Sequence, residues 1–166
     1  MAPAAPLDGT VHPNVDRVVR AARAEGLEVR PRSFPDGTKT AIDAARAIGV
    51  GVAQSVKSLV FAVDGRPVMA LVPGDRRLDE ALLAAAAGGT MVERMDAAAV
   101  RDATGFPIGG VSPVGHTLPV YVDSGIGVYD EVWVAAGTGH DVFSIAPSDL
   151  VRVTRGILCR LSGVPG

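Results

Sequence analysis

The sequence predicts a mixed α/β domain whose sheet is largely antiparallel. Helical and strand patterns are interspersed along the chain, and Asp64-Gly65 between two apolar runs is a strong hairpin signal. The length of 166 residues fits one domain, and 48% of the residues are hydrophobic. These observations argue against disorder and favour helices flanking an antiparallel sheet over a doubly wound fold.

Hydrophobic periodicity and turn residues place the individual elements. Asn14, Thr40 and Asp96 are expected N-caps, because their side chains can accept hydrogen bonds from free N–H groups. Gly49 is the expected C-cap of the second helix. The expected helices cover residues 15–25, 41–48, 79–87 and 97–104 with a single turn at 147–149, and the expected strands cover residues 28–34, 57–63, 67–72, 91–95, 119–122, 131–135 and 142–145.

Four segments show no periodicity. Residues 1–13 are rich in Pro and Ala and are expected to form a flexible N-terminal arm, and residues 156–166 a frayed C-terminal tail. Residues 106–116 and 137–141 are glycine-rich and are expected to be loops. The single domain is therefore expected to span residues 14–155.

Composition limits the location and partners. The formal net charge of −2 argues against a DNA-binding protein with a basic face and predicts a small footprint on any RNA. Cys159 is the only cysteine, so an intramolecular disulfide is excluded and a reducing compartment is permitted. We find no signal peptide and no apolar run long enough for a membrane span. A cytoplasmic protein without membrane contact is expected.

Lys57 is the most unusual residue. The chain has 16 lysines and arginines, of which only Lys39 and Lys57 are lysine, and Lys57 stands at the entry of an apolar strand. Burying an ammonium is unfavourable unless it has a partner or a chemical role. One interpretation is an anchor for a phosphate or carbonyl group, and the other is a strand-end lysine whose tip reaches water.

The loop at residues 109–116 is the second candidate. Its three glycines and one proline favour a fixed, irregular loop whose N–H groups cradle an anion or carbonyl oxygen, although a plain connection has the same composition. Ser112 does not fit a nucleophile elbow, because Gly110 and Gly115 bracket it with one residue too many.

Histidine spacing argues against a metal site. His116 and His140 lie in separate loops, and no H-E-x-x-H or C-x-x-C pattern exists, so no zinc is expected. Gly137-Thr138-Gly139 begins a dinucleotide fingerprint, but Val142 stands where its third glycine belongs. No cofactor is therefore expected, and His140 is either a loop histidine or a catalyst.

Three segments together resemble the YbaK-like, prolyl-tRNA-synthetase-associated editing domain family. They are residues 54–61 (QSVKSLVF), residues 105–116 (GFPIGGVSPVGH), and residues 136–140 (AGTGH) with 146–150 (APSDL). They occur in the family's order and extend the resemblance over residues 14–155. The resemblance implies a mixed α/β fold with a partly closed sheet.

The resemblance also implies a set of site residues. Lys57 is expected to anchor the substrate near its terminal nucleotide, and the loop beginning at Gly109 and Gly110 to contact the aminoacyl carbonyl. Phe34, Phe106 and Tyr121 are the candidates for base stacking. The residues expected to be catalytic are Lys57, Gly109 and Gly110, and those expected to bind substrate are Val111, Ser112, Pro113, Gly115, His116, Gly137, Thr138, His140 and Phe34.

The implied activity is hydrolysis of the ester that joins a small mischarged amino acid to the 3′ end of a tRNA. Alanine, serine, threonine and cysteine all remain candidates, and water is the expected nucleophile, oriented by the tRNA's free ribose hydroxyl. Without a synthetase body in the sequence, the chain is expected to act in trans, alone or docked on an aminoacyl-tRNA synthetase. The alternatives are a non-catalytic module that binds aminoacyl-tRNA or a synthetase, and a hydrolase of another small ester.

Overall fold

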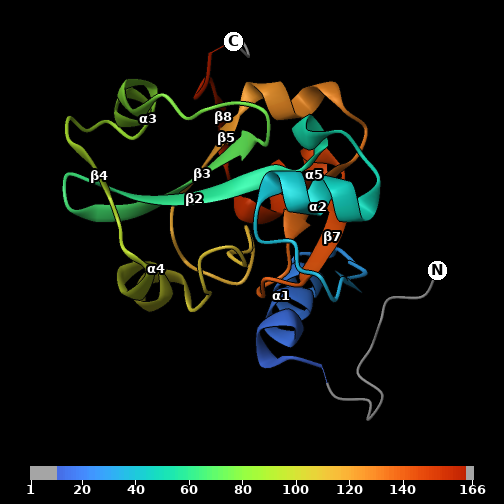
Figure 1. The fold of residues 1–166 in the computed structure, drawn as a ribbon. Coiled ribbons are helices and arrows are strands. Elements are labelled where there is room, and N and C mark those ends of the chain that lie inside the picture. Colours follow the sequence, from blue (N-terminus) through green and yellow to red (C-terminus); the bar gives the residue numbers. More distant parts are fainter. Residues whose placement is uncertain (1–10, 164–166) are drawn as a thin grey trace.

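The structure, a computed structural model, describes residues 11–163. Five α-helices and two β-sheets form this part of the chain (Figure 1). The strands are β1 (Arg32–Ser33), β2 (Val56–Val63), β3 (Arg66–Pro73), β4 (Val92–Arg94), β5 (Val120–Asp123), β6 (Val132–Ala135), β7 (Asp141–Ile145) and β8 (Ile157–Cys159). The α-helices are α1 (Pro13–Ala24), α2 (Ala41–Ile48), α3 (Glu80–Ala86), α4 (Ala97–Thr104) and α5 (Pro147–Thr154), and two 3₁₀ turns are η1 (Val52–Gln54) and η2 (Ser124–Val128).

The larger sheet has the strand order β4-β2-β3-β5-β8. The predicted hairpin is confirmed: β2 and β3 pair antiparallel, and Asp64 and Gly65 have positive φ angles of 50° and 80° at their turn. Two residues with positive φ form the turn whose twist matches that of antiparallel strands. β5 and β8 add to this hairpin in parallel, so the sheet is mixed.

The smaller sheet has the order β1-β7-β6 and is antiparallel throughout. An isolated bridge between Ser55 and Trp133 links it to the start of β2. The expected mixed, largely antiparallel fold is confirmed. The expected partial closure is not found: neither sheet closes within residues 11–163, and the two sheets are joined only by the isolated bridge at Ser55 in this part of the chain.

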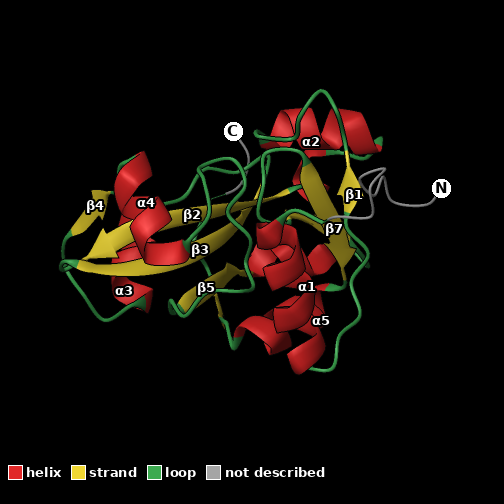
Figure 2. Cartoon of the chain, turned by 90° about the horizontal axis from the view of Figure 1, so that it is seen from below, coloured by secondary structure: helices red, strands yellow, loops and turns green. Residues whose placement is uncertain are grey.

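The core lies on both faces of β3. Met69 and Leu71 belong to the larger apolar cluster with Phe106 and Phe143, whereas Ala70 and Val72 belong to a second cluster on the other face. This alternation follows from the period of two in a strand. Figure 2 shows that helices lie on opposite sides of the β2–β3 hairpin, which explains why β3 is apolar along its length.

Locally encoded helix ends match the predictions. Thr40 caps α2 by accepting from Asp43 N, and Gly49 ends it with φ 90°. Asp96 caps α4 as expected, by accepting from Ala99 N. At α1 the expected cap is wrong: the imidazole of His12 accepts from Asn14 N, while the Asn14 amide donates to the distant Gly137 carbonyl. A long-range contact therefore replaces the local cap.

The expected bounds of four segments are corrected. The strand expected at residues 28–34 is limited to Arg32–Ser33, which form an edge strand of the smaller sheet. The expected tail is ordered in part, because β8 pairs with β5 and Leu161 is completely buried. The expected single turn at 147–149 extends to the full helix α5. Residues 1–10 of the expected arm lie outside the described part, and Pro13 already belongs to α1.

Candidate active site

The candidate site lies at a gap in strand pairing along β2. One edge of β2 pairs with β3 over its whole length. On the other edge, Ser55 bridges Trp133 of β6, and residues 61–63 pair with β4. Within the described residues, no strand pairs with residues 56–60 on that edge. Two cavities lie along this gap, one toward β6 and the other toward β4.

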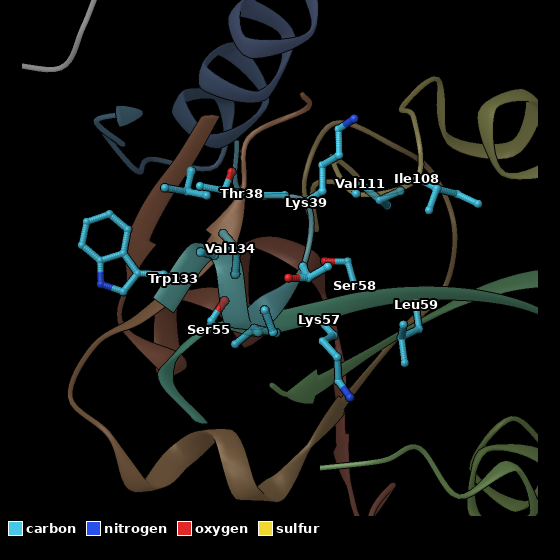
Figure 3. A pocket seen from close by; sticks show the side chains of 17 residues that line it. Thr38, Lys39, Ser55, Lys57, Ser58, Leu59, Ile108, Val111, Trp133 and Val134 are labelled. Carbon is cyan, nitrogen blue, oxygen red and sulfur yellow. The ribbon is translucent and has the colours of Figure 1, made fainter. Parts of the chain in front are cut away.

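The first cavity has a volume of about 300 Å³ and lies between β2, β6 and the start of α2 (Figure 3). Its wall is mainly apolar. Lys39 and Lys57 are its two charged residues. The lining residues are Thr38, Lys39, Thr40, Ala41, Ala44, Ser55, Val56, Lys57, Ser58, Leu59, Ile108, Gly109, Val111, Trp133, Val134, Ala135 and Val142.

The second cavity has a volume of about 350 Å³ and lies between β2, β4 and the start of α3. It shares the segment around Lys57 and Gly109 with the first cavity but carries more charge. The lining residues are Lys57, Ser58, Leu59, Val60, Phe61, Arg77, Leu78, Glu80, Arg94, Met95, Val100, Ile108, Gly109 and Val111.

Lys57 is half-buried, and its ammonium donates a hydrogen bond to the backbone carbonyl of Arg76. Burial lowers the pKa of Lys57, nearby Arg77 lowers it further, and Asp75 opposes the shift. The contact with the Arg76 carbonyl uses one of the three ammonium donors, so the other two remain for a ligand. Lys57 is thus a positioned cation rather than a lysine that extends freely into water.

The carbonyl that holds Lys57 lies in a segment that is itself fixed. The guanidinium of Arg76 lies 3.8 Å from the buried carboxylate of Asp123. Asp123 also accepts from Leu161 N at 2.7 Å and from Ser162 Oγ at 3.0 Å. The Asp123 carboxylate therefore binds both the C-terminal segment and the side chain of Arg76, the residue whose carbonyl holds Lys57.

Ser58 stands beside Lys57 and leaves the strand in the opposite direction (Figure 3). Its Oγ is buried and has no hydrogen-bond partner within residues 11–163. An unsatisfied buried hydroxyl costs about 1–3 kcal/mol, and native structures contain few of them. Ser58 lines both cavities, and its hydroxyl is an unsatisfied polar group in their shared wall.

The two glycine-rich loops pack against each other at the mouth of the first cavity. Gly109 has φ +88°, and a Cβ there would lie 3.0 Å from Lys39 Cβ. A Cβ at Gly110 would lie 2.5 Å from the backbone carbon of Thr138. Glycine is required at both positions, by conformation at the first and by close backbone approach at the second.

The rest of the first loop lies farther from the cavities, apart from Val111, which lines both. Ser112 is fully buried, and its Oγ accepts from Val114 N at 3.2 Å. His116 bonds the Pro113 carbonyl at 2.8 Å and accepts from Leu118 N at 2.9 Å. Pro113, Gly115 and His116 line a third cavity of about 370 Å³ that shares no residue with the first two.

The second loop flanks the first cavity without lining it. Gly137 packs against the backbone of Asn14, and Thr138 donates to the carboxylate of Asp141. His140 is exposed, and its Nδ1 lies 3.3 Å from the carbonyl oxygen of Phe34. Phe34 is partly exposed beneath the Arg32 guanidinium, which lies 5.0 Å from its ring centroid. These residues form one cluster outside the cavity wall.

The aromatic residues differ in their availability to a base. Phe106 is 0% exposed and Tyr121 is 8% exposed, so neither ring presents a face for stacking. Phe34 is the one residue of these three that is not buried. Trp133, the single tryptophan of the chain, lines the first cavity although no sequence motif marks it as a site residue. Lys39 stands out in the sequence only as a rare lysine, and it lines the first cavity.

The described residues offer no metal centre, since no group of three or more potential side-chain ligands forms within 11–163. None of the helices in this part is both long and apolar enough to cross a membrane.

Comparison with known proteins identifies the family. Residues 35–153 match the aminoacyl-tRNA editing domain family. A crystal structure provisionally assigned as a trans-editing enzyme for prolyl tRNA synthetase has a TM-score of 0.86 and 37% identity, covering 93% of this chain and 100% of its own. EbsC of Enterococcus faecalis, provisionally assigned as a Cys-tRNA(Pro)/Cys-tRNA(Cys) deacylase, is 30% identical over 115 residues, which are 68% of this chain and 70% of EbsC.

Larger proteins match as well. The proline–tRNA ligase of Maridesulfovibrio salexigens is 34% identical over 106 residues, which are 63% of this chain and 18% of the ligase. The chain thus spans about a fifth of the length of such ligases. The family match covers most of the chain, including β2 and both glycine-rich loops. The chain therefore belongs to the aminoacyl-tRNA editing domain family.

Proposed function

We propose that this protein is a hydrolase that removes a small mischarged amino acid from the 3′ end of a tRNA. The observation that carries the proposal is the gap along β2, where Lys57, Ser58 and Gly109 lie at the junction of two cavities. An aminoacyl-tRNA end has two parts joined by an ester, the amino acid and the terminal adenosine. A junction between two cavities suits a substrate of this form.

The first cavity suits the aminoacyl group. Ala41, Ala44 and Val134 contribute small apolar side chains to its wall. Such a pocket separates amino acids that differ by one methylene by only about 1–3 kcal/mol, which is why a second sieve improves fidelity. Alanine, serine, threonine and cysteine are the candidate groups, and the assignment of the relative EbsC supports including cysteine.

Water is the proposed nucleophile. The wall of the first cavity, as far as residues 11–163 form it, contains no carboxylate, imidazole or thiol. A free ribose hydroxyl of the substrate is therefore the proposed group that orients the water. A tRNA whose terminal 2′-hydroxyl is replaced by hydrogen should be deacylated much more slowly, and an unchanged rate would contradict this part of the mechanism.

The loop opposite Lys57 is proposed to contact the ester carbonyl. The Gly110 N–H already donates to the Pro107 carbonyl at 2.9 Å. Among the described residues no acceptor is assigned to the N–H groups of Gly109 and Val111, which makes them the better donors. Lys57 is proposed to anchor the adjoining part of the tRNA end. A tRNA substrate is also consistent with the expected cytoplasmic location and with docking on a synthetase.

The test is a deacylation assay on tRNAs mischarged with alanine, serine, threonine or cysteine. We expect the wild type to cleave one or two of them. Lys57→Ala should lower the rate by about 100-fold or more and remain folded, with a loss of stability of about 1 kcal/mol from the missing bond to the Arg76 carbonyl. Lys57→Arg, which retains the charge, shows whether charge alone suffices. If a folded wild type cleaves none of the panel, the alternative of a non-catalytic binding module becomes the better interpretation.

A further inference from the structure

The second cavity concentrates positive charge. Lys57, Arg77 and Arg94 line it, and Glu80 is its single acidic residue. The whole chain, in contrast, has a formal net charge of −2. Neither Arg77 nor Arg94 forms an ion pair with another described side chain, so the charges of both are available to a ligand. The local excess of cations indicates an anionic ligand.

The two arginines come from different elements, one next to Lys57 and the other four residues farther along β2. Arg77 follows Arg76, whose carbonyl holds the Lys57 ammonium, and its charge contributes to lowering the pKa of Lys57. Arg94 ends β4, and its backbone pairs with Phe61 of β2. The strand register therefore places Arg94 just past the unpaired stretch of β2.

The rest of the second cavity is apolar. Its large apolar side chains are those of Leu59, Phe61, Leu78, Met95 and Ile108. An apolar wall together with guanidinium groups is suited to a nucleoside that carries a phosphate. Arginine binds phosphate through two parallel N–H donors, which gives direction as well as charge.

We infer that Arg77 and Arg94 bind the phosphate that joins the terminal adenosine of the tRNA to the nucleotide before it. This inference rests on the proposed function and adds the direction in which the substrate lies. The aminoacyl group enters the first cavity, the ester lies at Ser58 and Gly109, and the adenosine enters the second cavity. The chain of the tRNA then leaves past β4.

The test combines kinetics and binding for Arg77→Ala, Arg94→Ala and the double variant. On the substrate that the wild type cleaves, we expect KM to rise about tenfold for each single variant, with kcat nearly unchanged. A contact to the phosphate stabilises the bound substrate and the transition state equally, so its loss weakens binding without slowing the chemical step. The slope of log affinity against log salt should become shallower by about 0.7 for each phosphate that the variant no longer neutralises. Arg160→Ala is the matched control, because this exposed arginine follows β8 at the opposite edge of the sheet from β4.

Comparing the binding of adenosine with that of adenosine 5′-monophosphate isolates the contribution of the phosphate to affinity. We expect the monophosphate to bind the wild type about tenfold more tightly than adenosine, and this preference to disappear in the double variant. A wild type that deacylates tRNA while the double variant keeps its KM, salt slope and preference for the monophosphate would overturn this inference and leave the proposed function intact. A wild type without deacylase activity would overturn the function, and the binding comparison would still decide the role of the two arginines.

Discussion

The two cavities beside β2 share one wall and differ in almost everything else. Lys57, Ser58 and Gly109 belong to both. Toward β6 the remaining wall consists mainly of small apolar side chains, with Trp133 of β6 beside them, whereas toward β4 it includes two arginines and a glutamate. One unpaired strand edge therefore offers two chemically distinct environments that meet at a single lysine. This difference is the basis of the proposal that the two cavities receive two parts of one ligand.

The largest expected effect comes from filling the first cavity. Ala44 is buried on α2 and lines this cavity, so Ala44→Leu occupies the space proposed for the amino acid. We expect kcat/KM for deacylation to fall by about 100-fold or more, equivalent to about 2.7 kcal/mol. Binding of adenosine 5′-monophosphate should be unchanged, because the second cavity does not include Ala44.

Ala47→Leu is the control for that variant, since Ala47 lies on the same helix but outside the cavity wall. Equal losses of activity in both variants would indicate a general effect on α2. A loss of monophosphate binding in Ala44→Leu would mean that the two cavities are not independent.

A smaller effect is expected at the shared wall. Ser58→Ala removes the buried hydroxyl that has no partner in the described residues, so its free energy of unfolding should stay equal or increase. We expect the deacylation rate to fall by about tenfold, as for loss of one hydrogen bond to the reacting end of the substrate. Ser58→Thr, which keeps the hydroxyl, should retain most of the rate.

Ser112→Ala gives the opposite pattern and serves as the comparison. Its Oγ accepts from the buried Val114 N–H, so its removal should cost about 1 kcal/mol of stability. Should Ser58→Ala lose stability and keep its rate, the hydroxyl is structural and has no role toward the substrate.

The smallest effect concerns the third cavity and depends on pH. Burial lowers the pKa of His116 below its usual 6.5, so the unfolded chain binds a proton that the native state does not. Stability should therefore decrease as pH falls below about 6.5, with a slope of at most about 1.4 kcal/mol per pH unit. Protonation also removes the acceptor that His116 offers to Leu118 N.

Urea unfolding at several pH values measures this dependence. His116→Gln should flatten it, whereas His140→Gln, at an exposed position, should leave it as in the wild type. Parallel loss of stability in the wild type and His116→Gln would assign the acid sensitivity to another group. Neither substitution is expected to change the preference for adenosine 5′-monophosphate, since the second cavity contains no histidine among the described residues.

The sequence predicts best what is determined locally. Thr40 and Gly49 fix the ends of α2, and Asp64-Gly65 fixes the hairpin, because capping and turn residues act within a few positions. The predicted cap of α1 is wrong because the Asn14 side chain binds Gly137, far away in the sequence. β8 is not predicted because its order depends on Asp123 accepting from Leu161 and Ser162.

For the site as well, the sequence predicts the local features and not those that depend on long-range contacts. Lys57 stands out in the sequence as a rare lysine beside an apolar strand, and the glycines at 109 and 110 mark a constrained loop. The gap itself is invisible there, because it depends on how far β4 extends along β2. For the same reason the sequence indicates neither the buried Ser58 hydroxyl nor the separation of His116 from the cavities that Lys57 lines.

The contacts of Asp123 also affect the order of folding. This carboxylate joins the Arg76 guanidinium to backbone and side-chain groups 38 and 39 residues later in the chain. Contacts of such separation form slowly, and the parallel pairing of β3, β5 and β8 adds further long-range contacts. During synthesis the segment that holds Lys57 thus stays incompletely fixed until β8 has left the ribosome and docked. Assembly of the site is therefore expected among the last events of folding.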